Sequence, residues 1–256
     1  MGFLVNSFIE FPAPIVVDDT GLIAYYKFDE SSGTLLNKSI SGETLGTNAN
    51  GAENGNPTYD VSGVIDTAIS LDGTGDYFVL GTSQSQWNVL HNGLSDWTVC
   101  FWMKLNAVDP SAYQSMLSDG ATSGTDIQVG IALDDTGARD HKLQVLITNG
   151  SGQRYLNTSD DFIPKNTSTW YFYTITYTAS GDVFNVYRDT ANNENNTSTF
   201  TNSTSNSSDP MSLGSVGDHS ASDMNAIFDE MSIWSRLLSS DEIGELYNSG
   251  SGLAIY

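Results

Sequence analysis

Hydrophobic and polar residues alternate along much of the chain. From Ile127 to Leu133 every second residue is a large aliphatic one, which predicts a strand with one buried face. From Trp97 to Leu105 apolar residues occur in both alternating sets, as in a central strand that is covered on both faces. Clusters of Gly, Asn, Asp and Ser separate such runs, as turns require. Further apolar runs predict strands at Leu22–Phe28, Val64–Leu71, Tyr77–Leu80, Leu143–Thr148, Trp170–Thr178, Val183–Arg188 and Ala226–Trp234.

One helix is predicted near the end of the chain. Ser239 stands three residues before Glu242, which is the spacing of a capping box. The helix is expected to end near Tyr247, because Asn248–Gly250 follows. Many short strands and one short helix predict an all-β fold: a two-sheet antiparallel β-sandwich of the jelly-roll type with one short C-terminal helix.

The first 20 residues form a separate segment in this interpretation. They contain neither Lys nor Arg, so they lack the basic region of a secretory signal. Polar residues and prolines interrupt their apolar stretch, so no membrane span is predicted. We interpret residues 1–20 as an N-terminal arm that adds a strand or docks on a partner, and residues 21–256 as one domain.

The charge of the chain is strongly one-sided. Its 256 residues include 9 Lys and Arg against 31 Asp and Glu, which gives a net charge of −22. Nucleic-acid binders need clustered basic residues, so that class is disfavoured, and an anionic membrane surface repels such a chain. Cys100 is the single cysteine, so no intramolecular disulfide is predicted.

Four segments carry motifs that occur together in one known family. They are Gly21–Gly33, Ile69–Tyr77, Trp97–Lys104 and Ile227–Ser239. In order and spacing they resemble an opening strand, an F-D-G-x-x-D-Y turn, an F-T-I-S-F-W-V-K strand and a closing strand with its helix entry. This set is similar to laminin G-like jelly rolls of the concanavalin A-like lectin/glucanase superfamily. The resemblance implies the fold, but the fold hosts lectins, adhesion modules, glycosidases and spacers.

Acidic turns are the first candidate site. The tripeptide Phe-Asp-Glu occurs at residues 28–30 and again at 228–230, and the resemblance implies that the first and last strands are neighbours. Asp72 and Asp76 flank glycines in a second turn. Because calcium takes six to eight oxygen ligands, Asp29, Asp72, Asp76 and Asp229 are a candidate calcium site. The alternative is that these residues only form turns.

The remaining acids and histidines carry weaker signals. Asp134, Asp135 and Asp140 form a second acidic group, which is interpreted as a solvated loop. The three histidines have neither an H-E-x-x-H motif nor paired spacing, so no zinc site is expected.

Exposed aromatic residues are the second candidate site, because sugar faces stack on Trp and Tyr beside polar groups. Trp87 lies in a predicted polar loop, Gln84–Asn92, and Tyr113 and Tyr155 are also candidates. The other tryptophans lie on predicted strands and are expected to be buried.

Two classes of function fit the sequence best. The leading interpretation is a non-catalytic module that recognises a glycan or another surface protein at the exterior of a cell or particle. The alternative is a structural or decoration protein of a virion or surface array, attached to capsid or other virion proteins through residues 1–20. A polysaccharide hydrolase is disfavoured, because the E-x-D-x-x-E strand motif of retaining glucanases is absent. The predicted location is extracellular or on a virion surface.

Overall fold

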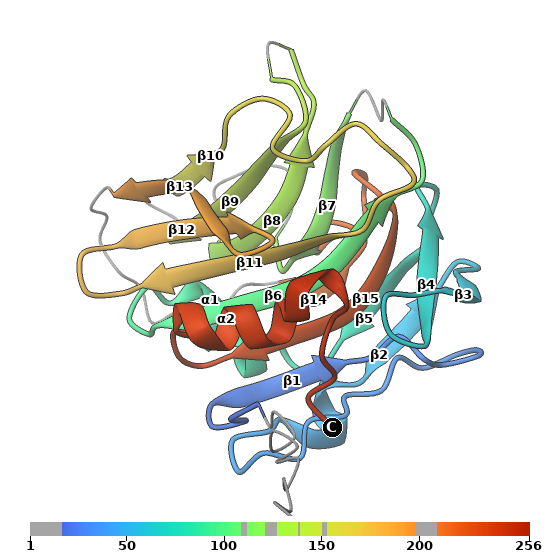
Figure 1. The fold of residues 1–256 in the computed structure, drawn as a ribbon, viewed down its shortest axis with the longest axis horizontal. Helices are drawn as coiled ribbons and strands as arrows, with labels where there is room; N and C mark the ends of the chain where they lie inside the picture. Colours follow the sequence, from blue (N-terminus) through green and yellow to red (C-terminus); the bar gives the residue numbers. More distant parts are fainter. Residues whose placement is uncertain (1–16, 109–111, 121–126, 138, 150–152, 198–208) are drawn as a thin grey trace, which may run out of the picture.

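The computed structural model describes residues 17–108, 112–120, 127–137, 139–149, 153–197 and 209–256. Their strands form two antiparallel sheets, which we call the β6 sheet and the β8 sheet (Figure 1). The β6 sheet contains β1 (Leu22–Tyr26), β3 (Thr58–Ser62), β4 (Thr67–Asp72), β6 (Trp97–Leu105), β11 (Tyr171–Thr178), β12 (Val183–Arg188), β13 (Ala191–Thr197) and β15 (Asn225–Trp234). The β8 sheet contains β2 (Gly51–Asn54), β5 (Tyr77–Leu80), β7 (Tyr113–Ser118), β8 (Ile127–Asp134), β9 (Lys142–Asn149), β10 (Gln153–Asn157) and β14 (Met211–Leu213).

The strand order confirms the predicted two-sheet sandwich. The β6 sheet runs β13-β12-β11-β6-β15-β4-β3, and the β8 sheet runs β10-β9-β8-β7-β14-β5-β2. The long strand β15 pairs with β4 through its first half and with β1 through its second half, while β6 pairs with its other edge. The first and last strands are therefore neighbours, as the resemblance implies.

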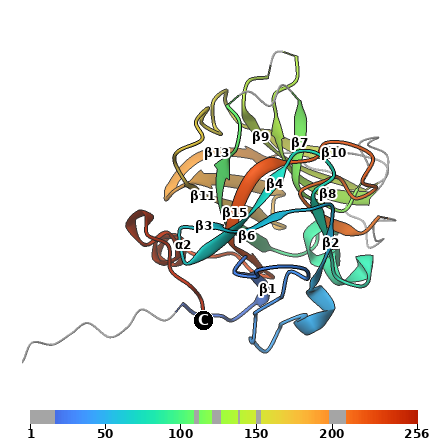
Figure 2. The ribbon, with the colours of Figure 1, turned by 90° about the vertical axis from the view of Figure 1, so that its right-hand side faces the viewer.

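Strand β6 contributes to both of the hydrophobic clusters in the described residues. Val99, Phe101 and Met103 belong to the core between the two sheets. Cys100 and Trp102 point to the other side, where they pack with the C-terminal helix α2 (Ser240–Tyr247). In the side view, α2 lies on one side of β6 and β15, and β7 and β8 lie on the other (Figure 2). The apolar residues on both faces of β6 thus have the two covers that their pattern predicts.

Helix α2 begins where the capping box predicts. The Ser239 hydroxyl accepts a hydrogen bond from the Glu242 backbone N–H at 3.3 Å, and the Glu242 carboxylate accepts one from the Ser239 N–H at 2.8 Å. Arg236 adds an ion pair to Glu242 at 2.6 Å. The helix ends at Asn248, which adopts a left-handed conformation with φ of 45°.

Shorter helical segments connect some of the strands. A polar loop was expected from Gln84 to Asn92, but this segment folds into the 3₁₀ turn η2 (Gln84–Trp87) and the short helix α1 (Asn88–His91). The other 3₁₀ turns are η1 (Gly46–Ala49) and η3 (Asn248–Gly250). In the described part of the chain, no helix is long and apolar enough to cross a membrane.

Only the end of the predicted N-terminal arm can be placed. Residues 1–16 lie outside the described residues. Val17 is buried in the cluster beneath α2. The Arg236 guanidinium donates to the backbone carbonyl oxygens of Thr20 at 2.5 Å and Asp18 at 3.1 Å. Packing of the domain therefore includes residues 17–20.

We expect Ser239→Ala to lower the stability of the protein, because it leaves the Glu242 N–H without its capping acceptor. The cost is about 1 kcal/mol, which corresponds to a fall in melting temperature of about 2–4 °C. Ser240→Ala is the matched control, because Ser240 is an exposed residue one position inside the helix. Thermal unfolding followed by circular dichroism measures both variants, and equal melting temperatures would contradict the capping role.

Candidate functional site

Asp29 and Asp229 lie close together at the junction of β1, β15 and the β3–β4 turn. The Asp229 carboxylate accepts hydrogen bonds from the backbone N–H groups of Val64 at 2.7 Å and Ile65 at 3.0 Å. Asp29 accepts one from the Thr67 N–H at 3.1 Å. Burial raises the pKa of Asp229 to about 7, and the nearby Asp29 charge adds to this rise. Both carboxylates therefore hold the β3–β4 turn in place.

Asp72 and Asp76 form a second pair, in the turn between β4 and β5. The buried Asp76 accepts hydrogen bonds from the N–H groups of Asn56 at 2.7 Å and Asp72 at 3.3 Å. The exposed Asp72 accepts one from the Thr74 N–H at 2.7 Å. This is the hydrogen-bonding pattern of a turn that is stabilised by its own aspartates.

The two pairs of aspartates do not share one centre. Asp72 pairs with Asn225, which precedes Asp229 by four residues on β15. At about 3.3 Å per residue, the two pairs are about 13 Å apart along the strand. A single calcium ion binds oxygens at about 2.3–2.6 Å, so it cannot contact all four carboxylates. A calcium ion at either pair stays a prediction.

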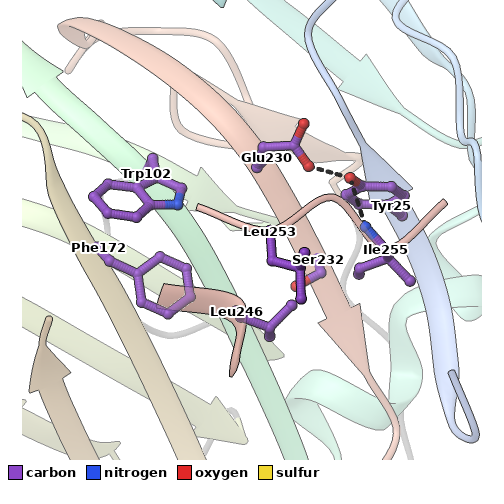
Figure 3. Close-up of a pocket in the computed structure, with 8 residues that line it drawn as sticks. All are labelled: Tyr25, Trp102, Phe172, Glu230, Ser232, Leu246, Leu253 and Ile255. Atoms are coloured by element: carbon purple, nitrogen blue, oxygen red, sulfur yellow. Dashed lines mark hydrogen bonds between the residues drawn. The ribbon is translucent and has the colours of Figure 1, made fainter. Parts of the chain in front are cut away.

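Glu230, beside Asp229, lines a small cavity beneath α2 that the sequence did not reveal. Figure 3 shows the Glu230 carboxylate facing the Tyr25 hydroxyl, with Ile255 on the other side of that hydroxyl. Tyr25 donates a hydrogen bond to Glu230 Oε2 and accepts one from the Ile255 N–H at 3.2 Å. The second oxygen of Glu230 has no partner, and the cavity of about 10 Å³ has room for about one water.

The surroundings of Glu230 favour its protonated form. The side chain is 6% exposed. Burial raises its pKa to about 8, and the neighbouring charge of Asp229 contributes to the rise. Apolar residues line most of the cavity, among them Trp102, Phe172 and Leu246. This arrangement clamps the C-terminal tail to β1 and β15 and leaves no room for a ligand of the size of a sugar.

The three predicted sugar-stacking residues occupy different environments. Trp87 is fully buried, and its indole N–H donates to the Leu80 carbonyl oxygen at 3.0 Å. The prediction of an exposed ring at this position is wrong, because the η2 turn folds the side chain into the core. Tyr113 is half-buried, and Tyr155 is 49% exposed.

Tyr113 and Tyr155 lie on the same face of the β8 sheet. Tyr113 pairs with Asp134, and Tyr155 pairs with Leu146. Their neighbours in the strands, such as Leu133 and Leu156, belong to the core between the sheets. Because side chains alternate along a strand, the two tyrosines point away from that core.

A polar network extends from Tyr113 on the outer side of the β8 sheet. The Tyr113 hydroxyl donates to Gln144 Oε1 at 3.2 Å. The Gln144 amide donates to Asn157 Oδ1 at 2.8 Å and to Asp134 Oδ2 at 3.3 Å. Burial raises the pKa of Tyr113, with the Asp134 charge adding to the rise, so the hydroxyl keeps its proton. We call Tyr113, Asp134, Gln144, Tyr155 and Asn157 the outer polar face. Tyr155 is its exposed member, Tyr113, Gln144 and Asn157 are half-buried, and Asp134 is fully buried.

Sequence reasoning found the two tyrosines of the outer polar face but missed its amides. Gln144 is a polar residue between Leu143 and Val145 on a strand whose other face is buried. That alternation already places it outward. Its hydrogen bonds to neighbouring strands depend on register, which a single sequence does not state.

The sheet order and the two clusters define the class of the protein as a jelly-roll β-sandwich of the concanavalin A-like kind. A laminin G family model, described as the concanavalin A-like lectin/glucanases superfamily, matches residues 71–244. The chain belongs to this laminin G-like family. No curated protein sequence matches the chain.

Solved structures of similar fold include binding domains of botulinum neurotoxins and of a mosquitocidal protein. The receptor-binding domain of botulinum neurotoxin C/D mosaic serotype has a TM-score of 0.64 and 13% identity, over 91% of this chain and 52% of that one. The binding domain of Paraclostridial Mosquitocidal Protein 1 has a TM-score of 0.66 and 16% identity, over 91% and 53%. The binding domain of botulinum neurotoxin DC in complex with SialylT has a TM-score of 0.65 and 16% identity, over 90% and 52%.

These similarities concern the fold. The chain spans about half the length of the solved domains that it matches. At such low identity, the shared architecture does not transfer a binding site from one protein to the other.

The pKa of Glu230 makes stability depend on pH. The native state holds this carboxyl proton up to about pH 8, whereas the ordinary value is 4.5. Between these values the native state binds more protons than the unfolded chain, so stability falls as pH rises. Between pH 5 and pH 9, we expect Glu230→Gln to reduce this loss of unfolding free energy by an amount on the order of 2 kcal/mol.

Melting temperatures at pH 5 and pH 9 test this expectation. Glu245→Gln is the control, because it makes the same carboxyl-to-amide replacement at a half-buried residue of α2. The unaltered protein and the control are expected to lose stability in parallel as pH rises, and Glu230→Gln is expected to lose less. Parallel behaviour of all three proteins would show that Glu230 is not protonated in the native state.

Proposed function

We propose that the protein is a non-catalytic module that binds a glycan on the outer polar face, at the exterior of a cell or particle. The observation that carries this proposal is the half-exposed ring of Tyr155 beside the hydrogen-bonded amides of Gln144 and Asn157. An aromatic ring offers a stacking surface to a sugar face, and amides offer donors and acceptors to its hydroxyls. The fold that the chain shares with toxin binding domains supports a binding role.

Charge indicates the class of glycan. The chain carries a net charge of −22. Two described basic residues near the outer polar face are already paired: Arg139 contacts Asp134 at 2.7 Å, and Lys142 contacts Asp160 at 2.9 Å. An anionic sugar therefore meets the net negative charge of the chain, and these two described cations are already engaged. We accordingly propose a neutral oligosaccharide as the ligand.

Binding to an array of neutral and sialylated oligosaccharides tests the proposal. We expect neutral glycans to bind, and Tyr155→Ala to weaken their binding at least tenfold, which corresponds to about 1.4 kcal/mol. Tyr256→Ala is the control, because Tyr256 is similarly exposed, at 42%, but lies in the C-terminal tail that covers the β6 sheet. The bound oligosaccharide is expected to be recovered intact after prolonged incubation.

Three results would contradict the proposal. They are an absence of glycan binding, equal binding by Tyr155→Ala and the unaltered protein, and cleavage of the bound oligosaccharide. Preferential binding of sialylated glycans would overturn the choice of a neutral ligand while leaving the binding face in place.

A further inference from the structure

The connection between β8 and β9 brings together two carboxylates and an imidazole. A ring nitrogen of His141 and one carboxylate oxygen from each of Asp135 and Asp140 all lie within 4.8 Å of one another. Among the described residues, no other set of three acidic, histidine or cysteine side chains converges in this way. The arrangement differs from the solvated loop that the sequence suggested for these aspartates.

Backbone hydrogen bonds from a distant segment hold this group in place. The Ile163 N–H donates to the His141 carbonyl oxygen at 3.0 Å, and the Asp161 N–H donates to the Asp140 carbonyl oxygen at 2.8 Å. The Asp135 carboxylate accepts a hydrogen bond from the His141 N–H at 3.4 Å. The backbone of Asp140 and His141 and the carboxylate of Asp135 are therefore held in place before any ligand arrives, which lowers the cost of binding one.

The imidazole of His141 has an unused nitrogen. The ring is fully buried, and Nδ1 lies 3.1 Å from the Ile163 carbonyl oxygen. A carbonyl only accepts hydrogen bonds, so Nδ1 carries the proton and Nε2 keeps a lone pair. Nε2 has no hydrogen-bond partner, although a buried polar atom normally has one. A histidine that donates one N–H to a backbone carbonyl is in the form found in metal ligands.

The donor set selects the kind of ion. Calcium prefers six to eight oxygens, whereas an imidazole with carboxylates suits zinc and neighbouring transition metals. Asp135 and Asp140 are half-buried, so an ion can reach them from solvent. We propose that Asp135, Asp140 and His141 form a site for a divalent transition-metal ion of the zinc class, with water as the remaining ligand. This site is independent of glycan binding on the outer polar face.

Lys165 competes with the ion for Asp140. Its ammonium lies 2.5 Å from Asp140 Oδ1 and 3.8 Å from Asp161. The side chain of Lys165 is 36% exposed, so it can turn toward Asp161 when an ion takes its place. Removing this ammonium strengthens metal binding, whereas removing a ligand weakens it.

Isothermal titration of the untagged full chain with zinc chloride at pH 7 tests the site. We expect one ion per chain. Asp135→Asn and Asp140→Asn are expected to weaken binding at least tenfold, and Lys165→Met is expected to strengthen it severalfold. At position 135, asparagine keeps an oxygen that accepts the hydrogen bond from the His141 N–H. Circular dichroism checks that each variant folds. Calcium chloride in excess is expected to leave zinc binding unchanged.

His219→Asn is the matched control, because His219 is a second histidine with acidic neighbours. His219 is half-buried and stacks on Tyr77, with 4.2 Å between the ring centres. The charges of Asp209, Asp218 and Asp223 act on its imidazole. This variant is expected to bind zinc as the unaltered protein does. The proposal is overturned if no zinc binds, if the two aspartate variants bind it unchanged, or if binding is lost in His219→Asn. If an aspartate variant fails to fold, a lack of tighter binding by Lys165→Met also overturns it.

Discussion

The organisation of this domain depends on two central strands, β6 and β15, that are apolar on both faces. One set of their side chains packs into the core between the sheets, and Trp102 and Trp234 lie in the cluster on the opposite side. Because burial of apolar surface is the main driving force of folding, both faces need a cover. The β8 sheet covers one, and α2 with the C-terminal tail covers the other. The outer side of the β8 sheet carries the exposed ring of Tyr155 and the half-buried amides of Gln144 and Asn157.

The same strand β15 carries two buried acids that connect the sheets to the loops around them. Asp229 binds the β3–β4 turn, and Glu230 binds Tyr25 and through it the tail. The register of β15 against β6 shifts between Asp229 and Ser232, and Glu230 adopts a φ of 50° at this bulge. The irregularity lets neighbouring carboxyls reach different partners. Burial of these groups disfavours their charged forms, which is why both pKa values rise.

Much of the fold follows from local sequence signals. The alternation at β8, the two apolar sets of β6 and the capping box at Ser239 each predicted an element that the structure contains. These signals suffice because each depends only on residues within one element. Contacts between elements produce no such local pattern. Trp87 was expected in a polar loop, but its segment turns into η2 and buries the ring against Leu80.

The candidate sites were predicted only in part, for the same reason. Tyr155 could be identified from its residue type, whereas its neighbours Gln144 and Asn157 became visible only through the pairing of β9 with β10. At Asp140 and His141, the hydrogen bonds come from residues 161–163, about 20 positions later in the chain. The spacing of a sequence motif detects metal ligands that lie on one helix or in one zinc finger. It does not detect a site whose residues are held in place by a segment distant in the sequence.

Part of the net charge of −22 comes from aspartates that have a structural role in turns. Several aspartates accept backbone N–H groups in turns, as Asp76 does for Asn56 and Asp229 does for Val64. In such positions a carboxylate replaces the backbone acceptor that a turn lacks, and it gains hydrogen bonds rather than serving only as surface charge. Near the outer polar face and the β8–β9 connection, Asp134, Asp140 and Asp160 pair with Arg139, Lys165 and Lys142. At the β8–β9 connection, the proposed cation would meet two carboxylates beside an imidazole, and their negative charge favours its binding.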